Sequence, residues 1–332
     1  MYILGIETSC DETSAAVLVD GKKIHSNVIF SQVNDHKPFK GVVPEIASRK
    51  HVEEINSIIE RAMAPLKKVD GVAVTVGPGL VGSLLVGKMT AEALSWVWDV
   101  PLVGVNHLEA HLFSSFLDTP KCSLPFVGLI VSGGHTNLVL VEDYGQYHVL
   151  GGTRDDSAGE AFDKVATLLG LGYPGGPPID LLAGRGDSKV IPFPKPSLEG
   201  TWDFSFSGLK TAVLYYLRKN PVDPKDFKTI SNICASFQSS VIEVLVQKTI
   251  RAAEKFGIHR ICVGGGVSAN SHLRELFKKE CDRKGLKVHF PSILLSTDNA
   301  AMIALIGYQK IKKGKFSKFL EVDPSLEISN WS

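Results

Sequence analysis

The chain has 332 residues, a formal net charge of +1 and 44% hydrophobic residues. This length predicts two domains, since a domain usually has about 150 residues. The composition is typical of a packed globular protein and excludes a disordered chain. The near-zero charge excludes an overall basic protein that coats nucleic acid, although it leaves room for a local basic patch.

Cysteine use and the N-terminal sequence both indicate a cytoplasmic protein. The five cysteines are an odd number, and no two of them are spaced as Cys-x-x-Cys, which is typical of reduced thiols. Glu7 interrupts the first apolar run too early for a signal peptide. No apolar stretch reaches the roughly 18 residues that span a membrane, so we expect no membrane segment.

The first 120 residues predict three strands followed by alternating helices and strands. The expected strands are Tyr2–Glu7, 14–19 and 23–29, with a hairpin turn at Asp20 and Gly21. Pro44 begins a pattern in which apolar residues recur at helical spacing. The pattern continues with a strand at 71–76, a helix at 80–98, a strand at 102–105 and a helical segment at 106–117.

The same layout then starts again. The expected strands are 126–131, 137–142 and 147–150, followed by helices at 158–169, 178–183, 206–218 and 230–256. A strand at 260–263, a helix at 269–283, a strand at 286–289 and a helix at 298–312 complete the chain. This weak internal repeat predicts two related α/β lobes with the ligand in a cleft between them. The alternative is two unrelated domains that each contain ordinary hairpins.

Three turns place glycine directly after apolar strands. They are GPGLVGS (77–83), SGGHT (132–136) and GGGVSAN (264–270). Glycine lets the backbone approach a ligand closely, and free N–H groups at a helix start favour anions. No turn matches a P-loop or the G-x-G-x-x-G pattern. Each turn alone suits a purely structural role, but three of them in a duplicated frame favour a nucleotide.

A metal site is indicated by His107 and His111 in HLEAH, because helical spacing places both imidazoles on one face. A zinc protease would have H-E-x-x-H, whereas Leu108 follows the first histidine here. Asp298 is a candidate third ligand, and two histidines with one carboxylate suit iron or zinc. The alternatives are two surface histidines and a plain helix N-cap at Asp298.

The motifs together resemble the universal tRNA threonylcarbamoyladenosine transferases, in their bacterial form called TsaD and formerly known as O-sialoglycoprotein endopeptidases. The resemblance covers nearly the whole chain. It rests on ten segments: GIETSCDETS (5–14), PEIASRKH (44–51), GPGLVGSLLVG (77–87), NHLEAH (106–111), VSGGHT (131–136), DDSAGEAFDK (155–164), YPGGPPID (173–180), FSFSGLKTAV (204–213), GGGVSAN (264–270) and STDNAAMIA (296–304).

This resemblance implies the actin, sugar-kinase and Hsp70-ATPase fold, with two duplicated α/β lobes around a nucleotide cleft. The first lobe is expected at 1–120 plus 298–332 and the second at 121–297. The implied enzyme is a metal-dependent acyltransferase. It moves the threonylcarbamoyl group from threonylcarbamoyl-AMP to the exocyclic amine of the adenosine 3′ to the anticodon (position 37), in tRNAs that read codons beginning with A.

The resemblance also implies ligands for each site. One divalent ion, iron or zinc, would be held by His107, His111 and Asp298. The adenylate would lie along Ile130, Val131, Ser132, Gly133, Gly134, Asp163, Gly176, Asp180 and Asn270. For the two aspartates and the asparagine, helix caps and turn formation are the alternative.

A general base should assist the weakly nucleophilic amine. Asp11 or Glu12 in the first polar turn is our candidate, and a solvated turn is the alternative. Basic clusters at 310–318 and at Arg49, Lys50 and His51 are candidate tRNA contacts, unless the first only complements a helix dipole.

The family's bacterial members work with the paralogue TsaB and the ATPase TsaE, and a threonylcarbamoyl-AMP synthase supplies the donor. An apolar helix face after Val42, Val43 and Pro44 is a candidate partner surface. Three other functions remain open: an ATP-dependent small-molecule kinase of the same fold, a metalloprotease, and a non-catalytic nucleotide-binding scaffold.

Overall fold

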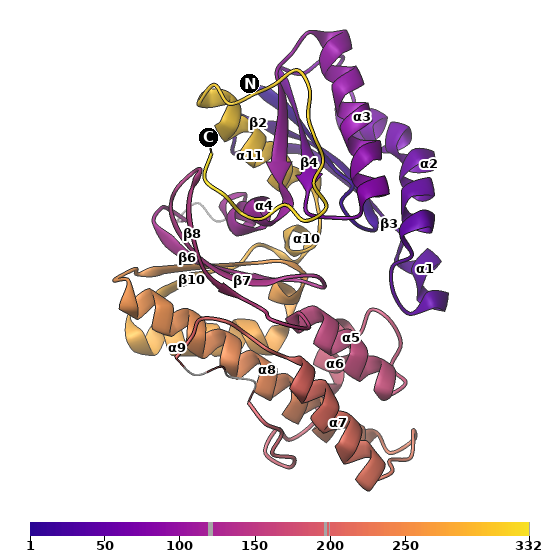
Figure 1. Cartoon of the computed structure of the whole chain (residues 1–332), viewed down its shortest axis with the longest axis vertical. Helices are drawn as coiled ribbons and strands as arrows, with labels where there is room; N and C mark the ends of the chain where they lie inside the picture. The colour runs from indigo at the N-terminus through magenta and orange to yellow at the C-terminus, as the bar shows by residue number, and fades with distance from the viewer. Residues whose placement is uncertain (119–121, 196–197, 199, 332) are drawn as a thin grey trace. The chain divides into compact units, whose positions relative to one another are not determined.

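The computed structural model describes residues 1–118, 122–195, 198 and 200–331 (Figure 1). The chain divides into two compact units, each with its own core. The first unit comprises Met1–Cys122 and Pro291–Ser332, and the second comprises Ser123–Phe290.

The first unit is built on a five-stranded sheet of order β3-β2-β1-β4-β5. Its strands are β1 (Tyr2–Glu7), β2 (Glu12–Val19), β3 (Lys23–Ser31), β4 (Gly71–Gly77) and β5 (Leu102–Asn106). β1 runs antiparallel to β2 and parallel to β4. The helices of this unit are α1 (Val33–His36), α2 (Pro44–Met63), α3 (Val81–Trp98), α4 (His107–Phe113), α10 (Ile293–Ser296) and α11 (Ala300–Lys312).

The two faces of the first sheet are covered by different helices, because successive strand residues point to opposite sides. Leu4 and Ile6 of β1 share a buried cluster with apolar residues of α2 and α3. Gly5 faces α11, and a Cβ at this position would lie 2.2 Å from the carbonyl oxygen of Ala300. The sheet is therefore sandwiched between α2 with α3 on one face and α11 on the other.

The second unit repeats this topology. Its strands are β6 (Phe126–Val131), β7 (Thr136–Asp143), β8 (Gln146–Gly152), β9 (Arg260–Gly264) and β10 (Lys287–His289). Their order, β8-β7-β6-β9-β10, matches β3-β2-β1-β4-β5 strand for strand. This correspondence confirms the predicted internal repeat. The helices of this unit are α5 (Ala158–Leu168), α6 (Gly176–Ala183), α7 (Ser207–Lys219), α8 (Phe227–Lys255) and α9 (Ser271–Lys284).

Helix α8 forms the centre of the second core. Among the described residues it is the one helix long and apolar enough to cross a membrane by length and composition, and 78% of its apolar window is buried. Ile233, Phe237 and Val241 of this helix pack into the same cluster as the apolar side chains of β6. Its apolar composition is therefore explained by burial inside the protein.

Helix ends differ from the expected ones where an asparagine caps the helix. The final helix begins at Ala300, and the side chain of Asn299 accepts a hydrogen bond from the Met302 N–H. α9 begins at Ser271 and is capped by Asn270 in the same way. The expected helix at 106–117 is α4, capped by Asn106 and followed by a separate 3₁₀ turn. Short helices such as α1 and α10 carry too few residues to show a period.

Candidate functional site

Helix α4 places two histidines side by side in the interior of the first unit. The side chain of its N-cap, Asn106, accepts hydrogen bonds from the N–H groups of Leu108 and Glu109. One helical turn separates His107 from His111, and their ring centroids lie 4.6 Å apart. The histidines are 7% and 0% exposed, so the alternative that they lie on the surface is wrong.

Asp298 completes this cluster from the turn that precedes α11. Its Oδ1 lies 3.1 Å from Nε2 of His111 and 3.4 Å from Nε2 of His107. One ligand atom from each of the three residues lies within 4.8 Å of the others. The alternative that Asp298 is a helix N-cap is wrong, because Asn299 caps α11. The Asp298 carboxylate therefore faces the two imidazoles.

The cluster fits a divalent metal ion. Nε2 of His107 and Nε2 of His111 both lie close to Oδ1 of Asp298, so three potential ligand atoms face one another. Two imidazoles and one carboxylate are the ligand set of many zinc and non-haem iron sites. His107, His111 and Asp298 are thus suited to hold such an ion.

Glu7 is the residue of this site that the sequence patterns did not reveal. It ends β1, is fully buried, and accepts hydrogen bonds from the Ser9 N–H at 2.6 Å and the Thr75 hydroxyl at 2.7 Å. Its Oε2 also lies 2.8 Å from Nδ1 of His107. An acidic residue at the end of an otherwise apolar strand is the signal that could have revealed it.

The electrostatics of the cluster favour a cation. Burial lowers the pKa of His107, but the carboxylates of Glu7 and Asp298 outweigh burial and raise this pKa well above its usual value. Burial raises the pKa of Asp298, but His107 and His111 outweigh burial and hold this pKa far below its usual range. Burial lowers the pKa of His111. Two carboxylates thus lie beside the two imidazoles, an arrangement that attracts a cation.

The polar turn between β1 and β2 is buried rather than solvated. Asp11 is 8% exposed, so the alternative of a solvated turn is wrong there. Glu12 is half-buried and accepts a hydrogen bond from the Ser31 hydroxyl at 3.1 Å. Burial, followed by the charge of Asp11, raises the pKa of Glu12 well above its usual value. A carboxylate whose pKa is raised is a stronger proton acceptor, so Glu12 is the better base candidate of the two.

Helices α2 and α3 hold this polar turn in place. The Leu80 N–H, just before α3, donates to the Ser9 carbonyl at 2.8 Å, and the Thr8 hydroxyl donates to the Ser83 carbonyl at 2.8 Å. His51 of α2 lies 3.0 Å from the Cys10 carbonyl through its Nε2. These hydrogen bonds tie the turn to α2 and to the start of α3.

The glycine turns of the second unit leave open space beside the backbone. A Cβ added at Gly133, Gly134 or Gly176 would meet nothing within 4 Å, and none of the three has a positive φ. Packing within the protein therefore does not require glycine at these three positions. Ile130 and Val131, by contrast, have fully buried side chains and can offer only backbone atoms to a ligand.

Asp163, Asp180 and Asn270 all form structural hydrogen bonds within the second unit. Asp163 accepts from the Gly175 N–H at 2.7 Å, and Asp180 accepts from both the N–H and the hydroxyl of Ser271 at 2.9 Å. Asn270 caps α9 and donates to the Gln238 side chain at 2.7 Å. The three residues therefore do make the capping and turn-forming contacts that were the alternative to ligand binding. Their role in adenylate binding stays a prediction.

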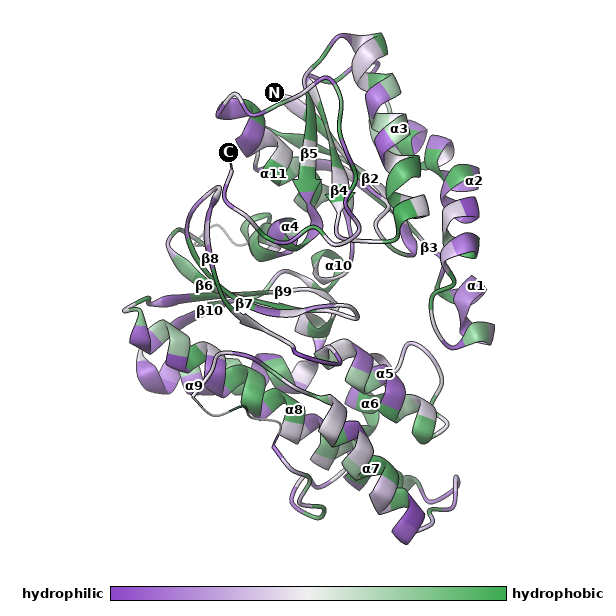
Figure 2. Cartoon of the chain, viewed as in Figure 1, coloured by the Kyte–Doolittle hydropathy of each residue, from purple (hydrophilic) through white to green (hydrophobic). Residues whose placement is uncertain are grey.

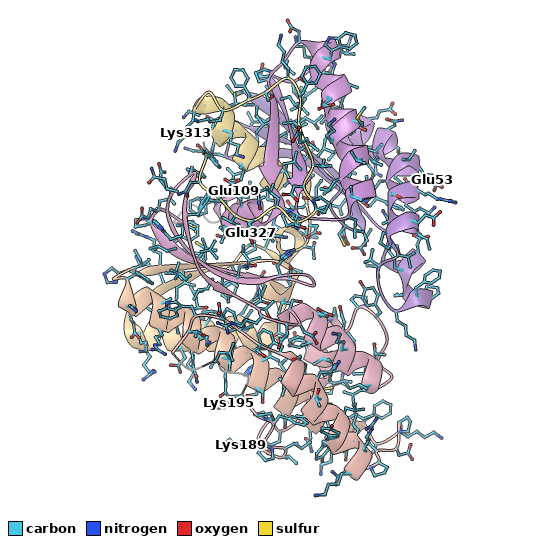
Figure 3. All side chains as sticks on the ribbon, viewed as in Figure 1. Glu53, Glu109, Lys189, Lys195, Lys313 and Glu327 are labelled. Carbon is cyan, nitrogen blue, oxygen red and sulfur yellow. The ribbon has the colours of Figure 1, made fainter. Side chains whose placement is uncertain are left out.

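The two basic clusters differ in how much charge they expose. His51 is fully buried, while Arg49 and Lys50 form ion pairs with Glu45 and Glu53 of the same helix. Figure 3 shows Glu53 pointing outward from α2. This cluster is therefore largely neutralised, and the assignment of His51 to a tRNA surface is wrong.

The lysine cluster near the end of α11 keeps more of its charge at the surface. Lys310 is partly buried and lies 3.7 Å from the Glu109 carboxylate. The other four lysines of the cluster are exposed: Lys312, Lys313, Lys315 and Lys318. These four make the cluster the better candidate for contact with RNA.

Comparison with known proteins identifies the family. Residues 23–305 match the family model described as TsaD, tRNA N6-adenosine threonylcarbamoyltransferase. A relative of that name from Endomicrobium trichonymphae is 52% identical over 342 residues, covering 100% of this chain and 99% of the relative. One from Clostridium perfringens is 50% identical over 332 residues, covering 98% of each chain.

The chain belongs to the TsaD family. It is therefore a transferase of tRNA modification, and the kinase, protease and scaffold alternatives are set aside. A TsaD relative from Geotalea uraniireducens is as similar, at 52% identity over 324 residues, covering 96% of this chain and 94% of the relative.

Solved structures with low sequence identity show the same fold. HypF from T. kodakarensis superposes with a TM-score of 0.64 at 14% identity, covering 96% of this chain and 48% of that protein. Component A of (R)-2-hydroxyglutaryl-CoA dehydratase from Acidaminococcus fermentans gives 0.57 at 16% identity, covering 94% and 99%. These neighbours confirm the predicted actin, sugar-kinase and Hsp70-ATPase fold for this chain.

Proposed function

We propose that this chain transfers the threonylcarbamoyl group of threonylcarbamoyl-AMP to the exocyclic amine of the adenosine 3′ to the anticodon (position 37), in tRNAs that read codons beginning with A. The observation that carries the proposal is a buried cluster of two histidines and a carboxylate, preassembled within a TsaD family sequence. Such a cluster gives this chain a built site for the donor's polar end or for a metal that contacts it.

The donor would be held by the glycine turns of the second unit. Threonylcarbamoyl-AMP is a mixed anhydride, so AMP is already a good leaving group, and the enzyme has to orient the donor and exclude water. Open space beside Gly133, Gly134 and Gly176 lets a phosphate approach the backbone. Asp163, Asp180 and Asn270 would contribute side-chain contacts to the ribose or base.

The metal would be held by His107, His111 and Asp298, with Glu7 orienting His107. Zinc or iron bound there would supply a Lewis acid and an anchor for the threonyl part of the donor. Three of the four side chains are buried, and Asp298 is half-buried against both histidines, so the cluster is held in place by contacts within the protein. Preorganisation of this kind lowers the entropic cost of binding.

A carboxylate of the first polar turn would accept the proton that the attacking amine loses. Glu12 is the preferred candidate because its pKa is raised, and Asp11 beside it is the second. Proton transfer at the moment of attack speeds such reactions by about 10²- to 10⁴-fold. The proton would leave the exocyclic nitrogen as the new C–N bond forms and AMP departs.

Partner proteins complete the proposed function. We assign the exposed apolar stripe of α3 to the paralogue TsaB. Val81, Leu85 and Met89 recur every four residues, and Trp96 and Val97 are 86% and 73% exposed. α3 is visibly more hydrophobic along its length than α2 (Figure 2). A stripe of this kind is typical of a protein interface. We also propose that TsaE takes part in the reaction, that a threonylcarbamoyl-AMP synthase supplies the donor, and that the protein is cytoplasmic.

The metal part of the proposal predicts the behaviour of ligand variants. His107→Ala and Asp298→Ala should each lose the bound metal and stop tRNA modification, because each removes one of three ligands. The helix and the core around them should persist, so circular dichroism should be unchanged. Metal content by elemental analysis and the modified nucleoside by mass spectrometry are the measurements. Full activity of either variant without bound metal would contradict the assignment.

A further inference from the structure

Residues Ser317–Trp331, which we call the strap, cross the first unit in extended form after α11. Figure 1 shows this segment as the yellow trace that leads to the C-terminal end. The strap is tied to two strands: the Ser317 N–H donates to the Leu102 carbonyl at 2.9 Å, and the Asp323 N–H donates to the Val76 carbonyl at 2.9 Å. Gly77 lies so close that a Cβ there would be 2.0 Å from the Asp323 carbonyl oxygen.

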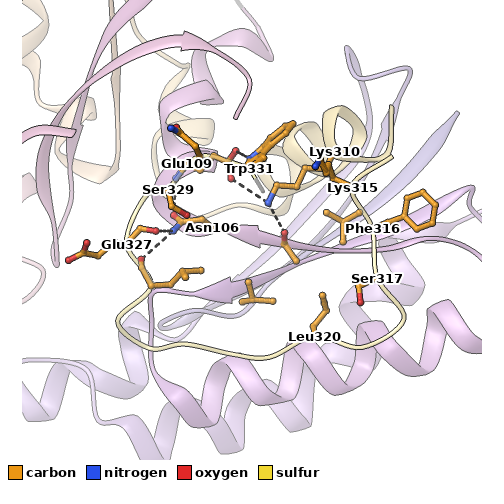
Figure 4. A pocket seen from close by; sticks show the side chains of 15 residues that line it. Asn106, Glu109, Lys310, Lys315, Phe316, Ser317, Leu320, Glu327, Ser329 and Trp331 are labelled. Carbon is orange, nitrogen blue, oxygen red and sulfur yellow. Dashed lines mark hydrogen bonds and ion pairs between the residues drawn. The ribbon is translucent and has the colours of Figure 1, made fainter. Parts of the chain in front are cut away.

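The strap contacts the N-cap of the helix that carries both histidines. Asn106 uses its Oδ1 to cap α4 and its Nδ2 to donate to the carbonyls of Leu326 and Glu327, at 3.2 and 3.0 Å. Figure 4 shows Asn106 reaching the strap beside Glu327. Because one side chain makes both sets of contacts, the position of the strap and the start of α4 are linked.

The strap contacts α4 again between the two histidines. The indole N–H of Trp331 donates to Oε1 of Glu109 at 2.6 Å, and Glu109 is only 2% exposed. Lys310 and Lys313 place their ammonium groups 5.3 and 5.4 Å from the Trp331 ring. A cavity of about 420 Å³ separates strap and sheet, so discrete contacts rather than continuous packing hold this part (Figure 4).

We propose that the strap positions α4 through Asn106 and Glu109, and thereby sets the geometry of His107 and His111. The inference rests on the proposed metal site. A helix of seven residues is too short to be stable by itself, so its position depends on contacts from outside. Trp331 is then a positioning residue. It touches neither ligand, but it fixes the residue that lies between them.

The test is a zinc titration by competition with a chromophoric chelator, on wild type, Trp331→Ala and Trp331→Phe. Trp331→Ala should bind zinc about 10-fold more weakly, the lower end of the range for residues that support metal ligands. Trp331→Phe keeps a ring over the lysines but lacks the N–H donor, so its affinity should fall by a smaller factor. Phe39→Ala is the control, because it removes an exposed aromatic ring from the same unit.

A geometric role is separated from a general loss of stability by two further readouts. With cobalt in place of zinc, the visible absorption bands report ligand geometry and should shift in Trp331→Ala but not in Phe39→Ala. Glu109→Ala combined with Trp331→Ala should lower affinity no further than either change alone, because both remove the same contact. Wild-type zinc affinity and an unchanged cobalt spectrum in Trp331→Ala would overturn the inference. A wild type that binds no zinc would instead overturn the metal site on which it rests.

Discussion

At the scale of single residues, Glu7 determines which nitrogen of His107 carries a proton. Its carboxylate accepts from Nδ1 of His107, which leaves Nε2 as the nitrogen that faces Asp298. Burial raises the pKa of Glu7, but the charge of His107 outweighs burial and holds this pKa below its usual value. Glu7 therefore stays ionised, and in the proposed metal site it would be the carboxylate that orients the ligand His107.

Replacing the charge of Glu7 should weaken metal binding without disturbing the fold. Glu7→Gln keeps the shape and one acceptor oxygen but removes the negative charge, so zinc affinity measured by calorimetry should fall about 10-fold or more. Glu60→Gln is the matched control, because it makes the same change at an exposed position of α2. Equal zinc affinity in Glu7→Gln and wild type would show that Glu7 does not support the site.

The proposed donor site can be tested by the variant Gly134→Ala, which adds a single methyl group. Its Cβ would meet nothing within 4 Å in the ligand-free chain, so Gly134→Ala should fold with an unchanged melting temperature. The added methyl should nevertheless occupy the space of the phosphate and weaken AMP binding about 10-fold or more, a loss of roughly 1.4 kcal/mol.

The control for this prediction is Gly41→Ala. Gly41 also has open space around it but lies in the first unit, so AMP binding should not change. Calorimetric titration with AMP compares the two variants directly. If Gly134→Ala binds AMP as tightly as Gly41→Ala does, the phosphate does not lie beside Gly134.

Part of the metal cluster could be predicted from local spacing and part could not. His107 and His111 are four residues apart, so helical geometry alone places them together. Asp298 lies far along the chain, so spacing makes it no more than a candidate. Glu7 stands at the end of a predicted strand, and nothing local shows that β1 ends beside α4. Contacts between distant segments depend on the packed fold and leave no periodic signal.

At the scale of elements, α3 combines a buried side that holds the polar turn with an exposed apolar side. Its first turn accepts the Thr8 hydroxyl through the Ser83 carbonyl, while Met89 is 57% exposed on the other side. A partner bound to the exposed stripe would therefore contact the same helix that holds the turn with Asp11 and Glu12. Partner binding could in this way change the position of the proposed base.

A charge placed in this stripe should abolish partner binding. Met89→Asp introduces a carboxylate that would have to be desolvated in the interface, so the complex with TsaB should weaken by at least 100-fold or ~2.7 kcal/mol. Because Met89 is exposed, the isolated chain should keep its melting temperature. Size-exclusion chromatography and calorimetry with TsaB measure both effects.

Leu181→Asp is the matched control, since Leu181 is 64% exposed on α6 of the second unit. It should leave the complex intact. Persistence of the complex in Met89→Asp, or its loss in Leu181→Asp, would place the interface elsewhere.

Strands and long helices could be predicted because they have local signals, and the strap could not because it has none. β1 and β2 are short, almost wholly buried runs bounded by turn residues, and α2 carries a helical repeat of apolar residues. Ser317–Trp331 forms no helix or strand. Its contacts with Asn106 and Glu109 join segments more than 200 residues apart. Such a segment appears in a sequence only as a polar tail with a few aromatic residues.

At the scale of the whole molecule, the fold is a repeat of one sheet topology, and the net charge bears on how the protein could bind tRNA. Two sheets of identical strand order give two units with different candidate sites: the first contains the cluster of His107, His111 and Asp298, and the second contains the open glycine positions Gly133, Gly134 and Gly176. With a net charge of only +1, the chain has its candidate tRNA contact in a local cluster, of which Lys312, Lys313, Lys315 and Lys318 are exposed. Binding through phosphates of this kind weakens steeply with salt.

The most direct test of the account is transfer of a labelled group in a reconstituted reaction. Threonylcarbamoyl-AMP made from ¹³C-threonine is incubated with the chain, TsaB, TsaE, ATP and an unmodified tRNA that reads codons beginning with A. Mass spectrometry of the digested tRNA should then find the label on the adenosine 3′ to the anticodon. The label should be absent without the chain and absent when that adenosine is replaced by guanosine. Equal labelling without the chain, or no labelled nucleoside with every component present, would contradict the account.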